Sequence, residues 1–287
     1  MMGILGHRKL GDFEIWAVRA GTVKMDGGAM FGVIPRPLWE KRIPPDERNR
    51  IRLGMTCLLV RTQDETIVIE TGFGGKVNEK LREIFGLDES DGLLASLASV
   101  GVAPEDVDRV IVTHLHQDHA GGCTIWEKGG YAPTFPNARY FVQRVEWDDA
   151  VGADAQTVNG FRMEEVLRPL EKAGVLNFLD GDTEICTGVR VVSTPGHTRG
   201  HQSVLVASGG ETVCFVGDLV PTSHHLKPIY VMAYDLYPRE TFVNKQAILN
   251  QAVQDQWLVV WPHDPEIGWS YVRIDDRDGF ATMDRLD

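Results

Sequence analysis

Several features that point to particular classes of protein are scarce or missing in this chain of 287 residues. The four cysteines are scattered and form no CxxC pair, so neither a zinc ribbon nor a disulfide framework is indicated. No apolar stretch reaches the roughly 18 residues that a membrane-spanning helix needs. The opening stretch MMGILGHRKLGDFE holds too short an apolar run for a signal peptide. We therefore expect a cytoplasmic protein without a membrane partner, in which Cys57 and Cys214 are buried thiols.

Basic residues are also few compared with acidic ones. The 29 lysines and arginines face 41 aspartates and glutamates, which gives a formal charge of −12. Proteins that bind nucleic acids carry a basic surface, so this balance argues against a nucleic-acid partner. It suits a small-molecule substrate that is uncharged, because an acidic protein repels polyanions at long range.

Apolar patterning predicts strands and helices along the whole chain, with no linker that would divide it. Strands are expected at 12–21, 55–62 and 66–72, the last two as a hairpin across the QDE turn. Amphipathic spacing that ends at a glycine predicts a helix over 162–174. We expect a single α/β domain over residues 1–287, built in two halves with sheets inside and helices outside. Residues 1–11 are expected to be flexible.

The segment 22–53 interrupts this pattern and is predicted to be a loop. Met30, Phe31, Ile34 and Trp39 make it more apolar than a solvated loop needs to be. Such a loop covers either a pocket or a subunit interface, with plain packing on the core as the alternative. We therefore expect the segment to cover the functional site or to hold together a homodimer.

Three of the nine histidines lie within VTHLHQDHAGG, residues 112–122, at the end of an apolar run. His114 and His116 alternate, so at a strand end their side chains point to the same side. Asp118 and His119 follow in the turn, where the chain can curl back toward the same point. A lone histidine is more often a structural residue, but this spacing is typical of metal ligands.

Three later strands also end in potential ligands: His197 after VRVVSTPG, Asp218 in VCFVGD and His263 in WLVVWPHD. Imidazoles and carboxylates suit zinc, iron, manganese or cobalt, and the absence of thiolates argues against an iron–sulfur cluster. Five histidines and two aspartates exceed the needs of one tetrahedral ion. They fit two divalent ions, with zinc favoured. Asp218 would then bridge a first ion at His114, His116 and His197 and a second at Asp118, His119 and His263.

These motifs carry a family resemblance. THLHQDHAGG resembles the HxHxDH motif of the metallo-β-lactamase superfamily, and TPGHTRGH, GD and PHD are similar to its remaining ligand positions, in the same order. The resemblance runs from EIWAVRAG to His263. It implies a four-layer αββα sandwich with the metal site at one edge between the halves, and the same division of ligands between two ions.

One departure from the family lies in VIETG, where members commonly carry aspartate at the position of Glu70. We predict that this carboxylate orients a metal-bound histidine, with local backbone hydrogen bonds as the alternative. A glutamate side chain is longer than that of aspartate, so the sequence does not identify the residue that Glu70 contacts.

The stretches 26–54 and 217–238 resemble those of quorum-quenching acyl-homoserine-lactone lactonases and methyl-parathion-hydrolase-like enzymes. The resemblance implies a metal-dependent hydrolase that opens acyl-homoserine or related lactones. In this hypothesis a hydroxide that bridges the two ions attacks the lactone carbonyl, and Asp118 or Asp218 carries a proton.

The same resemblance places Met30, Phe31, Ile34 and Trp39 along an apolar channel for an acyl chain. Many related lactonases carry a tyrosine three residues after the bridging aspartate, where this chain has Pro221. His224, His225 or Tyr234 could supply the hydrogen bond to the substrate instead. We favour His225, because it follows Asp218 closely in the chain.

Three alternative functions remain open at the level of the sequence. An organophosphate or aryl-ester hydrolase uses similar chemistry at the metal centre. A glyoxalase-II-like thioesterase shares every ligand but usually has a helical region after the last histidine, whereas DPEIGWSYVRIDD predicts a strand pair. A non-catalytic metal-binding module would keep the ligands without turnover.

Overall fold

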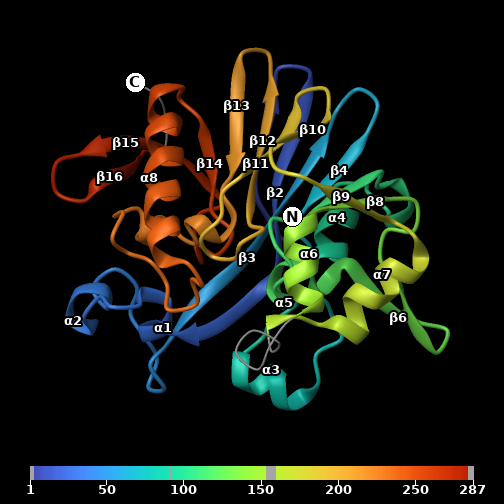
Figure 1. The fold of residues 1–287 in the computed structure, drawn as a ribbon, viewed down its shortest axis with the longest axis horizontal. Coiled ribbons are helices and arrows are strands. Elements are labelled where there is room, and N and C mark those ends of the chain that lie inside the picture. Colours follow the sequence, from blue (N-terminus) through green and yellow to red (C-terminus); the bar gives the residue numbers. More distant parts are fainter. Residues whose placement is uncertain (1–2, 91, 153–159, 284–287) are drawn as a thin grey trace.

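The computed structural model describes residues 3–90, 92–152 and 160–283, and two seven-stranded sheets lie at its centre (Figure 1). The first sheet runs in the order β1 (Ile4–Leu10), β2 (Phe13–Asp26), β3 (Arg50–Arg61), β4 (Thr66–Ile69), β5 (Arg109–Ile111), β8 (Arg139–Gln143) and β9 (Leu176–Leu179). The second runs in the order β10 (Thr183–Cys186), β11 (Val189–Ser193), β12 (Gln202–Ser208), β13 (Glu211–Phe215), β14 (Leu258–Val260), β15 (Trp269–Asp275) and β16 (Gly279–Met283). A separate hairpin pairs β6 (Thr124–Glu127) with β7 (Gly130–Pro133).

The two sheets pack against each other through alternate residues of their strands. Leu58 and Val60 of β3 belong to the core between the sheets, whereas Cys57 and Leu59 of the same strand belong to the core under the helices. Successive side chains of a strand point to opposite faces, so the unbroken apolar runs of the sequence mark strands that are buried on both sides.

Helices cover the outer face of each sheet. In Figure 1, α8 lies on one side of the strands, and α4, α6 and α7 lie on the other. The layers therefore run helix, sheet, sheet, helix, which confirms the predicted α/β sandwich. The helices are α1 (Gly27–Phe31), α2 (Arg36–Trp39), α3 (Glu79–Phe85), α4 (Leu93–Ser99), α5 (Gln117–Ala120), α6 (Arg144–Val151), α7 (Arg168–Ala173) after a π-helical turn (Met163–Leu167), and α8 (Pro238–Gln254).

Two expectations about the N-terminal part were wrong. Within residues 1–11, expected to be flexible, Ile4–Leu10 forms β1, which pairs antiparallel with β2. The segment 22–53, expected to be a loop, extends β2 to Asp26 and starts β3 at Arg50, with α1 and α2 between them. The two strands stay paired over this extension because Val23, Ile51 and Leu53 are buried.

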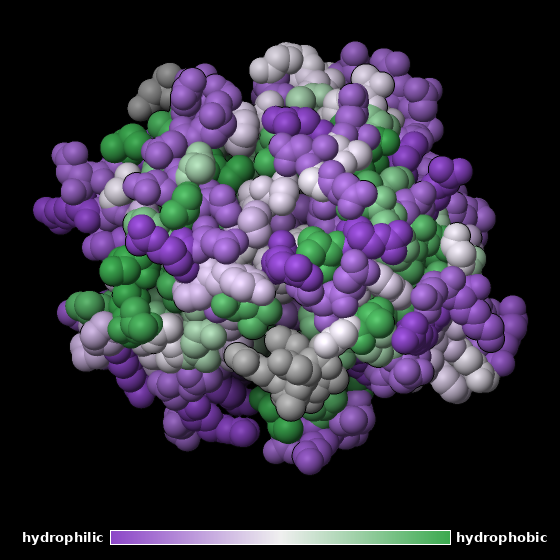
Figure 2. Space-filling model, in the orientation of Figure 1, coloured by the Kyte–Doolittle hydropathy of each residue, from purple (hydrophilic) through white to green (hydrophobic). Residues whose placement is uncertain are grey.

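The structure agrees with the expectation that Cys57 and Cys214 are buried thiols. All four cysteines are free, and Cys57, Cys123 and Cys214 are buried. Among the helices that the structure describes, none is long and apolar enough to cross a membrane. On the face drawn in Figure 2, hydrophilic residues dominate and hydrophobic ones are scattered among them.

Candidate metal centre

The predicted ligands converge from both sheets at one edge of the sandwich. His114 follows β5, and Asp118 and His119 lie in the short helix α5. His197, Asp218 and His263 follow β11, β13 and β14 of the second sheet. All of these positions come after the carboxyl ends of strands, where the chain can turn toward a common point.

Two glycines let the turn with the histidines sit close to the strand end beside it. A Cβ on Gly121 would overlap the backbone of Phe73, and one on Gly122 would overlap the backbone of Thr71. The backbone N–H of Thr71 donates to the carbonyl oxygen of His119 at 2.9 Å, which ties the turn down. Side chains at these two glycines would push the ligands out of place.

The first group of ligands is made of three imidazoles. Nδ1 of His116 lies 3.0 Å from Nε2 of His114 and 2.9 Å from Nε2 of His197. Burial and the neighbouring His197 lower the pKa of His116 to about 3, so its ring is neutral at neutral pH. Lone pairs that converge so closely suit a shared cation.

The second group consists of Asp118, His119 and His263. Nε2 of His263 lies 3.1 Å from Nε2 of His119, and Oδ2 of Asp118 lies 3.6 Å and 3.8 Å from these two nitrogens. Single ligand atoms of the three residues all lie within 4.8 Å of one another, close enough to hold one ion.

Asp218 lies between the two groups. Its Oδ2 is 3.3 Å from Nε2 of His197, while its Oδ1 is 3.1 Å from Nε2 of His263. Oδ1 is buried without a hydrogen-bond partner in the described part of the chain. Burial raises the pKa of this carboxyl, but His119, His263 and His197 outweigh that effect and hold it well below its usual range. An ionised, buried carboxylate with an unpartnered oxygen fits a bridge between two cations.

Apart from His116, each proposed histidine ligand makes a hydrogen bond through Nδ1, the ring nitrogen that faces away from the other ligands. Nδ1 of His119 pairs with Oε2 of Glu70 at 2.8 Å, and Oε1 of Glu70 accepts a hydrogen bond from the N–H of Thr113. The geometry therefore supports the predicted orienting role of Glu70 and identifies its partner. The remaining pairs join His197 to Asp235 (2.9 Å), His263 to the carbonyl oxygen of Gly54 (2.9 Å) and His114 to Oγ1 of Thr113 (3.0 Å).

Asp235 is the functional candidate that the sequence did not reveal. It is buried, accepts from His197, and also accepts a hydrogen bond from the N–H of Met232 at 3.0 Å. It lies in a loop 38 residues after its histidine, and no local pattern links the two.

A cavity of about 460 Å³ opens beside the ligands. His116, Asp118, His197, Asp218 and His263 form its polar end. Met30 and Tyr234, both expected to contact the substrate, line it. The apolar remainder was not foreseen and comes from several elements: Met25, Leu53, Phe85, Met232, Ala233 and Leu236.

Three other predicted substrate residues lie away from this cavity. Phe31 is fully buried and stacks between Trp39, at a ring distance of 5.5 Å, and His225, at 4.3 Å. Trp39 is buried with it, and Ile34 is half-buried against the same core. The short helices α1 and α2 turn Phe31 and Trp39 into the core, so neither ring lines the cavity.

The preference for His225 was wrong. Both of its ring nitrogens are occupied inside the protein, Nδ1 by Oγ1 of Thr222 at 2.8 Å and Nε2 by the carbonyl oxygen of Met30 at 2.9 Å. Burial lowers the pKa of His225 to about 3. The ring is a neutral structural link between the 222–225 turn and α1, and of the three candidates only Tyr234 lines the cavity.

Comparisons with known proteins agree with this geometry. Residues 52–263 match the metallo-beta-lactamase superfamily. The chain belongs to that superfamily. An N-acyl homoserine lactonase of Bacillus cereus is 32% identical over 168 residues, which are 55% of this chain and 60% of the relative. AttM of Rhizobium radiobacter, another N-acyl homoserine lactonase, is 28% identical over 184 residues, 63% of this chain and 66% of the relative. The chain thus matches less than two thirds of the length of these curated relatives.

Solved structures resemble the whole chain. A probable metal-dependent hydrolase from Staphylococcus aureus superposes with a TM-score of 0.87 at 32% identity and covers 98% of this chain and 100% of its own. AidC, a dizinc quorum-quenching lactonase in complex with a product, superposes with a TM-score of 0.80 at 23% identity, over 100% and 98% of the two chains. At that identity, AidC supports the fold alone.

Proposed function

We propose that this protein opens acyl-homoserine or related lactones with the help of two divalent metal ions, with zinc as the favoured metal. The observation that carries the proposal is the position of Asp218, whose two carboxylate oxygens face two different groups of ligands. A carboxylate shared in this way is what a dinuclear hydrolytic centre requires.

In this proposal His114, His116 and His197 hold one ion, Asp118, His119 and His263 hold the other, and Asp218 joins them. The bound ions would polarise the lactone carbonyl and make a water nucleophilic at neutral pH. Glu70 and Asp235 fix the rings of His119 and His197, so the ligands need little rearrangement when the ions bind. The carboxylate of Asp118 faces the cavity and can carry a proton to the leaving alkoxide.

Tyr234 is our candidate for the hydrogen bond to the substrate. Its side chain lines the cavity, and burial together with Asp26 and Asp118 raises its pKa to about 12. The phenol therefore keeps its proton at neutral pH and can donate it to a substrate oxygen. The apolar wall formed by Met25, Met30 and Leu236 suits an acyl chain.

The relatives support this substrate class. The Bacillus cereus and Rhizobium radiobacter proteins are both N-acyl homoserine lactonases. We also propose that the chain works as a homodimer, because Val33, which precedes α2, and Leu38, which lies within it, are 82% and 52% exposed.

A panel of substrates tests the function. Metal-loaded protein is offered acyl-homoserine lactones, aryl esters, phosphotriesters and thioesters, and we expect the highest kcat/KM for lactones. Preferred turnover of a thioester or a phosphotriester would contradict the lactonase proposal in favour of those two alternatives. Metal-loaded protein without turnover on any of them would identify a binding module.

The length of the acyl chain tests the apolar wall separately. Each buried methylene contributes up to about 0.8 kcal/mol, so kcat/KM should rise with chain length until the cavity is full. Leu236→Asp should flatten this rise and leave short lactones little changed, because Leu236 lines the cavity. Val243→Asp, a matched change at an exposed position of α8 outside the cavity, should keep the rise.

A further inference from the structure

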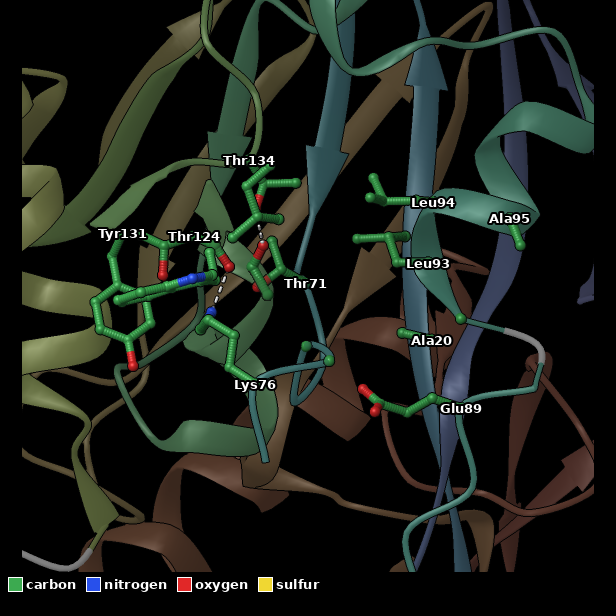
Figure 3. A pocket seen from close by; sticks show the side chains of 16 residues that line it. Ala20, Thr71, Lys76, Glu89, Leu93, Leu94, Ala95, Thr124, Tyr131 and Thr134 are labelled. Carbon is green, nitrogen blue, oxygen red and sulfur yellow. Dashed lines mark hydrogen bonds between the residues drawn. The ribbon is translucent and has the colours of Figure 1, made fainter. Parts of the chain in front are cut away.

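A larger cavity lies apart from the metal centre. It has a volume of about 590 Å³ and shares no lining residue with the cavity beside the histidines. Its walls come from the 71–76 segment, α4, and the hairpin of β6 and β7. Figure 3 shows Leu93, Leu94 and Ala95 on one side, facing Thr124, Tyr131 and Thr134 on the other.

Lys76 gives this cavity a positive charge. Its ammonium donates to the carbonyl oxygens of Gly121, at 2.5 Å, and Thr124. An ammonium has three N–H donors, so one is left for a ligand. Among the described residues no carboxylate lies within ion-pair distance of Lys76. Burial lowers the pKa of Lys76 to about 8, and Glu89, across the same cavity, raises it only slightly through its charge. The charge of Lys76 is therefore largely retained at neutral pH but poorly solvated.

The rest of the cavity is suited to an apolar body. Leu93, Leu94 and Ile125 line it, and Trp126 meets Tyr131 edge to face at a ring distance of 4.8 Å. Leu94 and Trp126 are 40% and 60% exposed, which is unusual for side chains of this size that line one hollow. Glu89 lies near the α4 side of the cavity, and its carboxylate is paired with Arg82.

We propose that this cavity is a second binding site, for a monocarboxylate with an aliphatic chain, with the carboxylate against Lys76 and the chain against Leu94 and Trp126. The charge selects an anion, and the apolar walls select an amphipathic one. The site does not depend on the substrate of the metal centre.

Titration of decanoate into the metal-loaded protein tests the proposal by calorimetry and tryptophan fluorescence. We expect decanoate to bind and decylamine, which has the opposite charge, not to bind. Lys76→Met should weaken decanoate binding by at least about ten-fold, as expected for the loss of a charged hydrogen bond. Leu94→Glu should weaken it similarly, because it adds a negative charge at a half-exposed position. Lys80→Met, a matched loss of an exposed lysine in α3, should leave binding unchanged.

The Trp126→Phe variant distinguishes binding in this cavity from binding at the metal centre. The calorimetric signal should persist in that variant, while most of the fluorescence response disappears. A fatty acid and the hydroxy acid left by lactone opening share the proposed chemistry, so decanoate and its γ-hydroxy derivative are titrated in parallel. The acid that binds more tightly indicates whether the site takes a fatty acid or the hydroxy acid left by lactone opening. The proposal is overturned if neither acid binds, or if both bind Lys76→Met and Leu94→Glu as tightly as the unchanged protein.

Discussion

Oδ1 of Asp235 lies 2.9 Å from Nδ1 of His197, and both side chains are buried. The other oxygen of Asp235 holds the backbone N–H of Met232, which lines the cavity. One carboxylate thus fixes a proposed metal ligand and the wall on which the substrate would rest.

Asp235→Ala should therefore weaken metal binding, because His197 loses the group that sets its ring orientation. Loss of such an outer contact lowers metal affinity by about 10–100-fold. Competition with a chromophoric chelator measures the change. Asp276→Ala, an exposed aspartate near the β15–β16 turn, is the control. Equal affinity in the two variants would show that Asp235 does not position the ligand.

Asp218→Ala should reduce metal content and turnover together. Both ligand groups lose an oxygen, so we expect fewer than two equivalents of metal and a fall in kcat of more than about 100-fold, beyond the effect of an outer contact. Metal analysis and lactone hydrolysis are measured on the same sample, with circular dichroism to check the fold. A folded variant with two tightly bound ions and full activity would disprove the bridge.

Acidification should release the ions. In the metal-free site burial lowers the pKa of His119, but Asp218, Glu70 and Asp118 outweigh it and raise that pKa well above its usual value. Protons therefore compete with metal at this ring, and metal affinity should rise with pH and fall as pH drops. We expect affinity at least about ten-fold weaker at pH 6 than at pH 8.

Glu70→Gln is the matched variant for this pH dependence, since it removes one of the carboxylates that raise the pKa of His119. The chelator competition should then depend less steeply on pH. An affinity that is flat between pH 6 and pH 8 in the unchanged protein would contradict the competition.

Tyr234→Phe should lower kcat/KM for lactones by about ten-fold, the value of one hydrogen bond to a substrate oxygen. Metal content should stay the same, because the phenol contacts no proposed ligand in the described structure. Tyr237→Phe, on a nearby tyrosine outside the cavity, is the control. Equal kinetics for Tyr234→Phe and the unchanged protein would remove Tyr234 from the proposed mechanism.

Replacement of both Val33 and Leu38 by aspartate should convert the expected homodimer to monomer, because two exposed apolar side chains become charged. Light scattering at micromolar concentration follows the mass. A monomer already present in the unchanged protein would show that this segment is not a subunit interface.

The convergence of the proposed ligands could be predicted from the sequence because its signals are local. His114, His116, Asp118 and His119 lie within six consecutive positions after an apolar strand, and the later proposed ligands also follow strand ends. Asp235 could not be predicted, since its contact with His197 depends on how a distant loop returns to the site. His225 misled the interpretation for a related reason: closeness in the chain to Asp218 does not determine where its ring points.

The N-terminal errors have a physical cause as well. The alternation of Val23 and Met25 with polar residues, and of Ile51 and Leu53, is a strand pattern. The glycines and the aromatic residues between these two stretches concealed it. Phe31 and Trp39 looked available for a substrate, but they stack on each other, Phe31 also stacks on His225, and both side chains lie in the core.

The seam between the two sheets carries one more consequence. His114 to His119 follow the first sheet, whereas His197, Asp218 and His263 follow the second. Ions bound at this seam would link the two halves, and their binding free energy would add to the stability of the folded protein. Removal of the ions would then lower the stability of the folded protein together with its proposed activity.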